Sequence, residues 1–340
     1  MWNRPGVIRA DSGSPQRVEF GSRPFVEGKG LRYRLAYRFR ILPTLLRTGR
    51  EARRGFSPLR WMPCRAATRA PEDLFVELEA FARAQGIDEL GYTTLEPSLL
   101  FRGKAVLYRQ VIVLVRQMDA EKLSLAPSFA ALSMIHGTYL ELGKATNRLA
   151  DRLRAWGYGA QADSPLGGAA LLPVLAMRAG LGAVGRHGLL ITPRFGSRQR
   201  LAAVYTNIQN LPAADNACGP GAGPHAWVRE YCDACGACLN LCPGQAILKE
   251  PLVLENGGLR HLDYTRCLPY FYALDGCSWC IKECPFNRVP YESLRREFRE
   301  HKRLRLYGET SDTSTGVHFR RESNATGSGR AGVVRTAGSG

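Results

Sequence analysis

Two runs of cysteines constrain this 340-residue chain more than any other feature. The first run has the spacing C-x2-C-x2-C-x3-C-P, and the second ends in C-x2-C-x3-C-P and is preceded by one offset cysteine. The eight residues are Cys232, Cys235, Cys238, Cys242, Cys267, Cys277, Cys280 and Cys284. A [4Fe–4S] cluster takes four thiolate ligands, and such runs are typical of proteins with two clusters. The sequence therefore predicts two [4Fe–4S] clusters and a redox function.

The order of the cysteines also predicts which of them share a cluster. In two-cluster ferredoxins, the fourth cysteine of each run ligates the cluster of the other run. This rule assigns one cluster to Cys232, Cys235, Cys238 and Cys284, and the other to Cys242, Cys267, Cys277 and Cys280. A proline follows the last cysteine of each run, and its fixed φ is expected to turn the chain back towards the cluster.

Zinc and disulfides are the alternative interpretations of these cysteines. A zinc site built from the two C-x2-C pairs leaves Cys238 and Cys242 unused, although they stand at cluster spacing. A disulfide framework suits a short secreted chain in an oxidising compartment. This chain is long and has no recognisable signal peptide, so we expect a cytoplasmic protein and favour the clusters. Cys64 and Cys218 lie outside both runs and are expected to be unreactive.

The pattern of helices and strands predicts one α/β layered domain ahead of the cysteines. Helical spacing and end signals predict helices over 71–86, 139–157 and 171–179, and apolar runs predict strands over 106–115 and 201–206. This alternation favours an α/β domain over 66–210. The cysteine runs then predict a small ferredoxin-like α+β domain over 211–295.

Basic residues are concentrated in the two ends of the chain. The net charge is +17, and residues 1–60 hold 14 Lys+Arg against 4 Asp+Glu. Residues 1–65 form a basic arm in which a helix begins near Leu31, with a leucine stripe among arginines and a kink at Pro43. Such a helix contacts a membrane surface or nucleic acid, or it packs on the main domain with its arginines in water. The polar composition of 296–340 predicts a disordered tail.

A glycine-rich string between the predicted helix and the next apolar run is the second candidate site. Gly180, Gly182 and Gly185 match the G-x-G-x-x-G string, but a helix precedes it and no acidic residue follows at the expected distance. A dinucleotide site is therefore disfavoured. Arg186 follows the glycines and Arg200 lies further on, so the loop suits anionic groups or a flat ligand, or it is simply a solvated basic loop.

The stretch AGLGAVGRHGLLITPRFGSRQRL over 179–201, followed by Tyr205-Thr206-Asn207 and the cysteine runs, resembles the reductive dehalogenase and epoxyqueuosine reductase superfamily. This resemblance implies a nitroreductase-like α/β domain that binds cobalamin beside one of two [4Fe–4S] clusters. It also implies Tyr139 as proton donor and Arg186 as the basic residue that assists it. The cofactor-binding positions that it suggests are Gly180, Gly182, Gly185, Arg186, Gly196 and Arg200.

The function that follows from the resemblance is a reductase in which two clusters pass electrons to cobalamin, which reduces a small organic substrate. The electron donor is then a ferredoxin, a flavodoxin or a reductase. Two alternatives stay open: a ferredoxin-type electron carrier without corrinoid chemistry, and a reductase that acts on tRNA. The epoxyqueuosine reductases carry an Asp-Tyr-His string, whose nearest match here is Thr138-Tyr139-Leu140.

Overall fold

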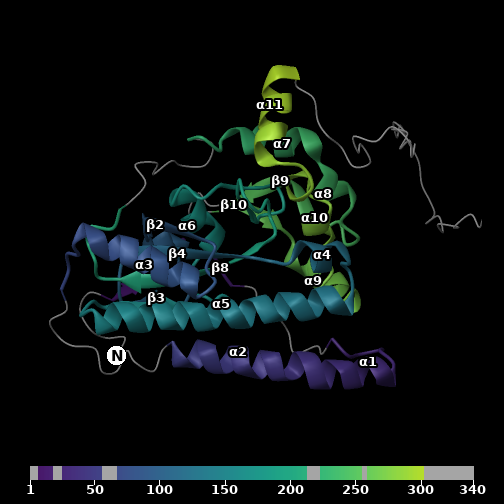
Figure 1. The fold of residues 1–340 in the computed structure, drawn as a ribbon. Helices are drawn as coiled ribbons and strands as arrows, with labels where there is room; N and C mark the ends of the chain where they lie inside the picture. Colours follow the sequence, from purple (N-terminus) through teal and green to yellow (C-terminus); the bar gives the residue numbers. More distant parts are fainter. Residues whose placement is uncertain (1–6, 18–24, 56–66, 213–222, 255–258, 302–340) are drawn as a thin grey trace, which may run out of the picture. The chain divides into compact units, whose positions relative to one another are not determined.

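The computed structural model describes residues 7–17, 25–55, 67–212, 223–254 and 259–301 (Figure 1). Cys64, Cys218 and the tail beyond residue 301 lie outside these ranges, so what the sequence predicts for them stays a prediction. The tail predicted to begin at 296 is helical up to residue 301. No helix in the described part of the chain is long and apolar enough to cross a bilayer.

The strands and helices of the first two thirds of the chain follow one another closely. In chain order they are β1 (Ile8–Arg9), α1 (Leu31–Ala36), η1 (Tyr37–Ile41), α2 (Leu42–Arg54), α3 (Glu72–Ala84), β2 (Glu89–Thr94), η3 (Pro97–Leu99), β3 (Ala105–Val106), β4 (Gln110–Gln117), α4 (Ala120–Ser124), α5 (Phe129–Ala155), β5 (Ala160–Asp163), α6 (Leu172–Arg178), β6 (Ala183–Val184), β7 (Leu190–Ile191) and β8 (Gln199–Thr206).

A four-stranded sheet in the order β2-β4-β8-β5 forms the centre of this region, and all of its neighbouring strands are antiparallel. Side chains alternate between the two faces of a strand. Ile112 and Leu114 accordingly pack with α3 and α5, whereas Val111 and Val113 pack with α6. The apolar run predicted as one strand over 106–115 is divided between β3 and β4. The mixed α/β fold is confirmed, but the sequence pattern did not predict β2 or β5.

Helix α5 is the longest element and starts ten residues earlier than the sequence pattern predicts. Ser128 caps its first turn, because its hydroxyl accepts a hydrogen bond of 3.1 Å from the backbone N–H of Ala131. The apolar spacing from Tyr139 onwards marked only the part of the helix that faces the sheet. The first turns carry His136 and Thr138, which interrupt that spacing although both are buried.

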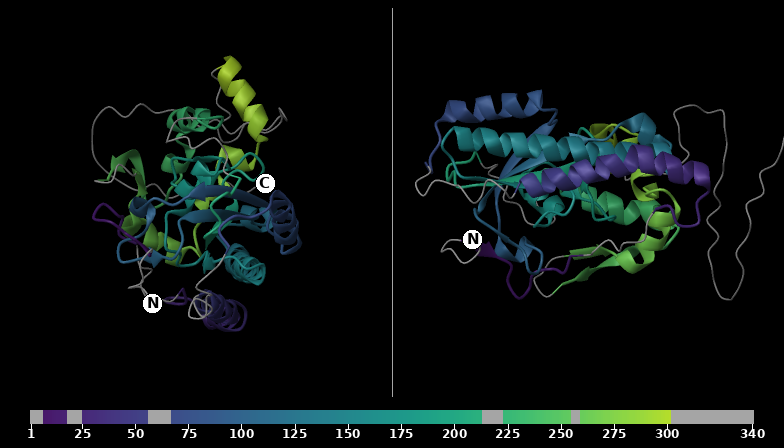
Figure 2. Two further views of the ribbon diagram at one scale, coloured as in Figure 1. Left: turned by 90° about the vertical axis from the view of Figure 1, so that its left-hand side faces the viewer. Right: turned by 90° about the horizontal axis from the view of Figure 1, so that it is seen from below.

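The basic helix predicted near Leu31 is present as α1, η1 and α2, which lie alongside α5 (Figures 1 and 2). A π-helical turn over Tyr37–Ile41 stands just before Pro43, where the sequence predicts a kink. The packing on the main domain that the sequence analysis considered buries only one side of this helical segment, at Ile41 and Thr48. A stripe of large apolar side chains is exposed instead, namely Leu31, Leu35, Phe39, Leu42 and Leu46.

The cysteine runs fold into short helices and one hairpin. The elements are α7 (Trp227–Cys235), α8 (Ala237–Asn240), β9 (Ile247–Val253), β10 (Leu259–Leu262), α9 (Tyr264–Ala273), α10 (Trp279–Lys282), η4 (Pro285–Asn287) and α11 (Tyr291–His301). The antiparallel β9–β10 hairpin joins the two runs. Around the first run, an aromatic core packs against Cys232, Cys235 and Cys284, and its largest members are Trp227, Tyr231, Phe286, Tyr291 and Phe298.

Candidate functional site

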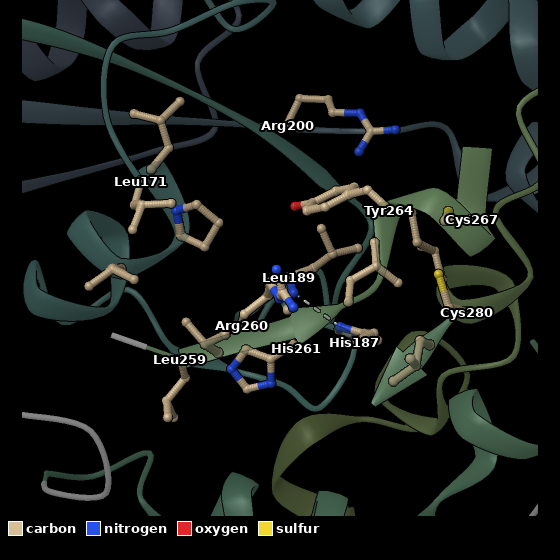
Figure 3. Close-up of a pocket in the computed structure, with 18 of the residues that line it drawn as sticks. Leu171, His187, Leu189, Arg200, Leu259, Arg260, His261, Tyr264, Cys267 and Cys280 are labelled. Carbon is tan, nitrogen blue, oxygen red and sulfur yellow. Dashed lines mark hydrogen bonds between the residues drawn. The ribbon is translucent and has the colours of Figure 1, made fainter. Parts of the chain in front are cut away.

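A cavity of about 1290 Å³ separates the sheet-bearing half of the fold from the cysteine-bearing half. It is larger than the roughly 300–1,000 Å³ of ordinary small-molecule sites. Figure 3 shows Leu171 across the cavity from Cys267 and Cys280, with Arg200 on one side and His187 and His261 on another. The lining is mainly apolar but contains seven arginines and only two acidic residues, Glu96 and Asp233. This cavity suits a large ligand with apolar surface and negative or neutral polar groups.

Most of the predicted cofactor residues border this cavity. Gly180, Gly182, Arg186 and Arg200 belong to its lining, whereas Gly185 and Gly196 do not. Gly196 has a left-handed backbone with φ +55°, and a Cβ there would overlap the carbonyl of Phe286. Gly196 therefore lets the β7–β8 turn approach the end of the second cysteine run, which is a structural role.

Gly182 is explained in a similar way by its backbone surroundings. A Cβ on this residue would overlap the carbonyl of Ile191, which belongs to β7. The string that resembles a dinucleotide motif follows α6, contains β6 and is followed by β7, so it lacks both the strand before it and the helix after it. The sequence argument against a dinucleotide site agrees with this local structure.

Arg186 is tied to the first cysteine run. Its guanidinium forms an ion pair with Asp233 of α7 and donates a hydrogen bond to the carbonyl of Lys249. Burial raises the pKa of the Cys232 thiol to about 12. A hydrogen bond from the backbone of Arg186 to this thiol acts in the opposite direction and lowers the pKa. The guanidinium of Arg186, which lines the cavity, is thus already bound by Asp233 and by the carbonyl of Lys249. It holds the glycine-rich loop against α7.

Tyr139 and Arg200 meet on the wall formed by α5 and β8. The guanidinium carbon of Arg200 lies 4.9 Å from the centre of the Tyr139 ring, which is cation–π distance. Both residues line the cavity. The Nε of Arg200 is buried and has no hydrogen-bond partner among the described residues. The structure therefore brings together a phenol and a guanidinium that the sequence had placed in separate motifs.

The eight cysteines fall into two electrostatic groups. Burial first, and then repulsion by neighbouring thiols, raise the pKa values of Cys232, Cys238 and Cys284, which act on one another together with Cys235, and those of Cys267, Cys277 and Cys280, which act on one another together with Cys242. Across the groups, Cys238 is the neighbouring thiol that raises the pKa of Cys280 most. The sequence rule assigns the same two sets to the two clusters, and which thiols share a cluster stays a prediction. Within the described ranges, no three Cys, His, Asp or Glu side chains are grouped closely enough to hold one metal ion.

Burial dominates the electrostatics of these thiols. It is the largest cause of the raised pKa values of Cys238 and Cys267, which reach about 11. Backbone N–H groups are directed at several sulfurs, as in the 3.3 Å hydrogen bond from Ala246 to the Sγ of Cys242. Cys277 and Ser278 have left-handed backbones with φ of 45° and 69°. Strained conformations of this kind concentrate at functional sites.

The sequence analysis missed the contribution of the hairpin that joins the two runs. Arg260 and His261 of β10, and Tyr264 at the start of α9, line the cavity beside the thiols (Figure 3). The only signal in the sequence was a basic pair a few residues before Cys267. His187 also lines the cavity and is almost fully buried; burial is the main cause that lowers its pKa to about 4.

Comparison with known proteins identifies relatives over most of the described chain. The tetrachloroethene reductive dehalogenase of Desulfitobacterium hafniense is 32% identical over 248 residues, which is 67% of this chain and 42% of that protein. The epoxyqueuosine reductase of Lactococcus garvieae is 30% identical over 140 residues, 38% of this chain and 35% of that one. The chain thus spans less than half the length of these relatives. No protein-family model matches the sequence.

Solved structures agree at the level of the fold. A catabolic reductive dehalogenase superposes with a TM-score of 0.64 at 20% identity, covering 86% of this chain and 45% of that one. A second reductive dehalogenase, described with a mechanism for B12-dependent dehalogenation, gives 0.56 at 22% identity over 69% of this chain and 35% of that chain. The chain therefore has the mixed α/β fold of the reductive dehalogenases. Together with its curated relatives, this places it in the superfamily of reductive dehalogenases and epoxyqueuosine reductases.

Proposed function

We propose that this chain is an iron–sulfur oxidoreductase in which two [4Fe–4S] clusters deliver electrons to a corrinoid bound in the cavity. The observation that carries the proposal is that one large cavity is lined by all four thiols of the second group and by Cys232 of the first. In this proposal residues 66–210 form the nitroreductase-like corrinoid and substrate domain. Residues 211–295 form the ferredoxin-like cluster domain.

The donor sets fit the proposed clusters. Each group supplies four sulfurs, and the first is packed against the aromatic core around Trp227 and Phe286. An apolar shell of this kind controls solvent access and hence reduction potential. In the proposal the first cluster is held by Cys232, Cys235, Cys238 and Cys284, and the second by Cys242, Cys267, Cys277 and Cys280.

The cavity also fits a corrinoid in size and in lining. Its volume of about 1290 Å³ suits a cofactor larger than most substrates, and Gly180 and Gly182 present backbone to it. The second structural neighbour, named for B12-dependent dehalogenation, supports the choice of cofactor. When bound, a corrinoid supplies low-potential chemistry for reactions such as R–X + 2e⁻ + H⁺ → R–H + X⁻. Arg186 and Arg200 are the basic residues that we expect to face it.

Within this proposal the residues of the α5–β8 wall handle the proton. Tyr139 is the proton donor, and Arg200 stabilises the phenolate that is left when the proton has gone. The position of Arg200 over the Tyr139 ring supports this pairing. Arg186 was predicted to assist electrostatically. Because Asp233 and Lys249 already engage its guanidinium, we propose that it acts by positioning the glycine-rich loop.

The proposed partners are an electron donor, a small organic substrate and a charged surface. A ferredoxin, a flavodoxin or a reductase is the donor that two low-potential clusters imply. The exposed stripe on α1, η1 and α2 is flanked by exposed arginines, which suits an anionic membrane surface. A role in tRNA reduction is a second candidate, favoured by the same arginines and by the epoxyqueuosine reductase relatives. A cytoplasmic location remains a prediction.

Metal analysis of anaerobically purified protein from cobalamin-supplied cells tests the proposal. About eight irons and one cobalt per chain are expected. Eight irons without cobalt would favour the electron carrier, and zinc in place of iron would overturn the cluster assignment. The tRNA role predicts binding at low salt that weakens steeply as salt rises. If tRNA does not bind at low salt, that role is excluded.

A further inference from the structure

Ser197 lies in the turn between β7 and β8 and reaches the cysteine-bearing half of the fold. The residue is buried, with only 1% of its surface exposed. Its side-chain hydroxyl donates a hydrogen bond to the sulfur of Cys284, the last cysteine of the second run. Cys284 is itself only 6% exposed. A buried hydroxyl from the sheet-bearing half thus bonds to a buried thiol of the other half.

Asn287 fixes the orientation of this hydroxyl. Its Nδ2 donates a hydrogen bond of 3.0 Å to the Oγ of Ser197, and its Oδ1 accepts one of 2.8 Å from the backbone N–H of Ser197. The backbone N–H of Asn287 in turn donates to the carbonyl of Cys284 at 2.9 Å. A serine hydroxyl has one proton and two lone pairs. Because Asn287 occupies a lone pair of the Ser197 oxygen, the hydroxyl proton is left for the sulfur.

The glycine before Ser197 makes this approach possible. A Cβ on Gly196 would overlap the carbonyl of Phe286 and the amide oxygen of Asn287. The backbone of the β7–β8 turn therefore lies directly against the end of the second cysteine run. The close approach has a chemical consequence, because it is what brings the Ser197 hydroxyl to the sulfur of Cys284.

The surroundings of Cys284 make a donor at its sulfur important. Burial first and repulsion by Cys232 second raise the pKa of the Cys284 thiol well above its usual value. The hydrogen bonds from the backbone of Phe286 and from Ser197 lower this pKa, so both stabilise negative charge on the sulfur. An aromatic core that includes Trp227 packs against Cys284. Away from water, a hydrogen bond to a charged sulfur is stronger than the same bond in solvent.

We propose that Ser197 raises the reduction potential of the first cluster through its hydrogen bond to Cys284, and that Asn287 is the positioning residue that holds the hydroxyl in place. This inference rests on the proposed function, in which Cys284 is a ligand of that cluster. Reduction adds negative charge that is shared by the ligand sulfurs. A donor at one sulfur therefore stabilises the reduced cluster more than the oxidised one.

A redox titration of the anaerobically purified full-length protein, followed by electron paramagnetic resonance, tests the inference. The signal of the first cluster is the one that Cys235→Ser should lose. In Ser197→Ala the equilibrium constant for reduction of this cluster should fall about tenfold, which is about 59 mV for a one-electron couple. The potential of the second cluster should not change. An unaltered potential of the first cluster overturns the inference.

The matched control is Thr192→Val, which removes another buried hydroxyl from the segment between β7 and β8. Thr192 is fully buried, and its Oγ1 accepts a hydrogen bond of 3.1 Å from the backbone N–H of Phe195. This variant should melt at a lower temperature than the wild type and keep both potentials. If it lowers the potential of the first cluster as much as Ser197→Ala does, any disturbance of the turn has this effect and the tuning role is wrong.

The role of Asn287 is tested by combining two substitutions. Asn287→Ala should lower the potential of the first cluster by less than Ser197→Ala, because the hydroxyl remains but is no longer held. The double variant should match Ser197→Ala alone, since Asn287 is expected to act through Ser197. A fall in the double variant equal to the sum of the two single falls overturns the positioning role.

Iron measured on the same samples separates this inference from the proposed function. Ser197→Ala should keep about eight irons per chain. Full iron with an unchanged potential would refute the role of Ser197 and leave the proposed clusters standing. Loss of about four irons in Ser197→Ala would mean that the hydroxyl is needed to hold the cluster, and the tuning role would be wrong. Zinc in place of iron in the wild type would overturn the proposed function and this inference with it.

Discussion

Arg186 forms an ion pair with Asp233, the residue that follows the proposed cluster ligand Cys232. The side chain of Arg186 is 11% exposed and that of Asp233 is 51% exposed, so the pair lies at the edge of the cavity and not in its interior. Through this pair and the carbonyl of Lys249, one side chain links the glycine-rich loop to α7 and β9. A motif residue expected to act on substrate is therefore also a connection between the two halves of the site.

Substitutions of this pair should separate positioning from catalysis. Arg186→Gln and Asp233→Asn should each lower the free energy of unfolding by about 1 kcal/mol at most, because one partner is half exposed. If Arg186 positions the loop through Asp233, both variants should keep their iron and lose turnover to a similar degree. Loss of turnover in Arg186→Gln with full turnover in Asp233→Asn would instead assign a direct catalytic role to Arg186.

Iron content in cysteine variants should reveal which thiols share a cluster. Cys235→Ser should reduce iron from about eight to about four per chain. Adding Cys284→Ser should remove no further iron, whereas adding Cys242→Ser should remove the rest. Cys64→Ser, outside both runs, is the control and should keep full iron. Equal loss in the two double variants would contradict the crossed assignment.

The buried carboxyl of Asp163 should make stability depend on pH. Burial raises its pKa to about 6, despite hydrogen bonds from the Tyr205 hydroxyl at 2.7 Å and from the Ala169 backbone. The folded protein therefore holds the proton more tightly than the unfolded chain, and stability falls as pH rises from about 4 to about 6. Roughly 1 kcal/mol of this fall should lie between pH 5 and pH 7.

Urea unfolding of the wild type and Asp163→Asn at both pH values measures this effect. The asparagine variant cannot ionise, so the difference in stability between the two proteins should change by that amount across the interval. A constant difference would mean that Asp163 is ionised throughout, and that Tyr205 and Ala169 stabilise the carboxylate.

The exposed stripe on α1, η1 and α2 should bind anionic membranes. Phe39 is 72% exposed and Leu46 is 62% exposed, with Arg38 and Arg50 close to them on the helical surface. Phe39→Ser combined with Leu46→Ser should weaken binding to vesicles containing phosphatidylglycerol about tenfold or more, as about 2 kcal/mol of apolar burial is lost. Binding should also weaken with salt.

A matched control for the stripe lies on α3. Val76 is 70% exposed, but its helix begins with Glu72 and Asp73 and has no basic residue before its last turn. Val76→Ser should not alter vesicle binding. If it weakens binding as much as the stripe variants, the contact is unspecific and the proposed surface is wrong.

Two glycines with left-handed backbones should differ in what they tolerate. Gly196→Ala should destabilise the protein by about 3 kcal/mol or more, because its Cβ overlaps the Phe286 carbonyl as well as straining the backbone. Gly103 has φ +76° with no atom within 4 Å of the added Cβ, so Gly103→Ala should cost only about 1 kcal/mol. Similar melting temperatures for the two variants would contradict the close approach at Gly196.

The local patterns of the chain were enough to predict several parts of this protein. Cysteine spacing predicts a ligand set within one short region, because the thiols that share a cluster come mostly from neighbouring turns. Helices α3 and α6 and strand β8 follow from apolar periodicity with clear end signals. Arg186 and Tyr139 were singled out through the resemblance to the family, and their roles stay proposals.

Only the tertiary structure decided how these parts meet. The antiparallel order β2-β4-β8-β5 places Arg200 of β8 beside Tyr139 of α5, and the hairpin brings Arg260 and His261 to the thiols. The spacing of residues along the sequence does not reveal such long-range contacts. His136 illustrates the limit: in the sequence it is one histidine without a partner. In the fold it is a buried ring on the wall of the cavity, and its nitrogens have no hydrogen-bond partner among the described residues, because burial and hydrogen bonding are decided only when distant segments pack together.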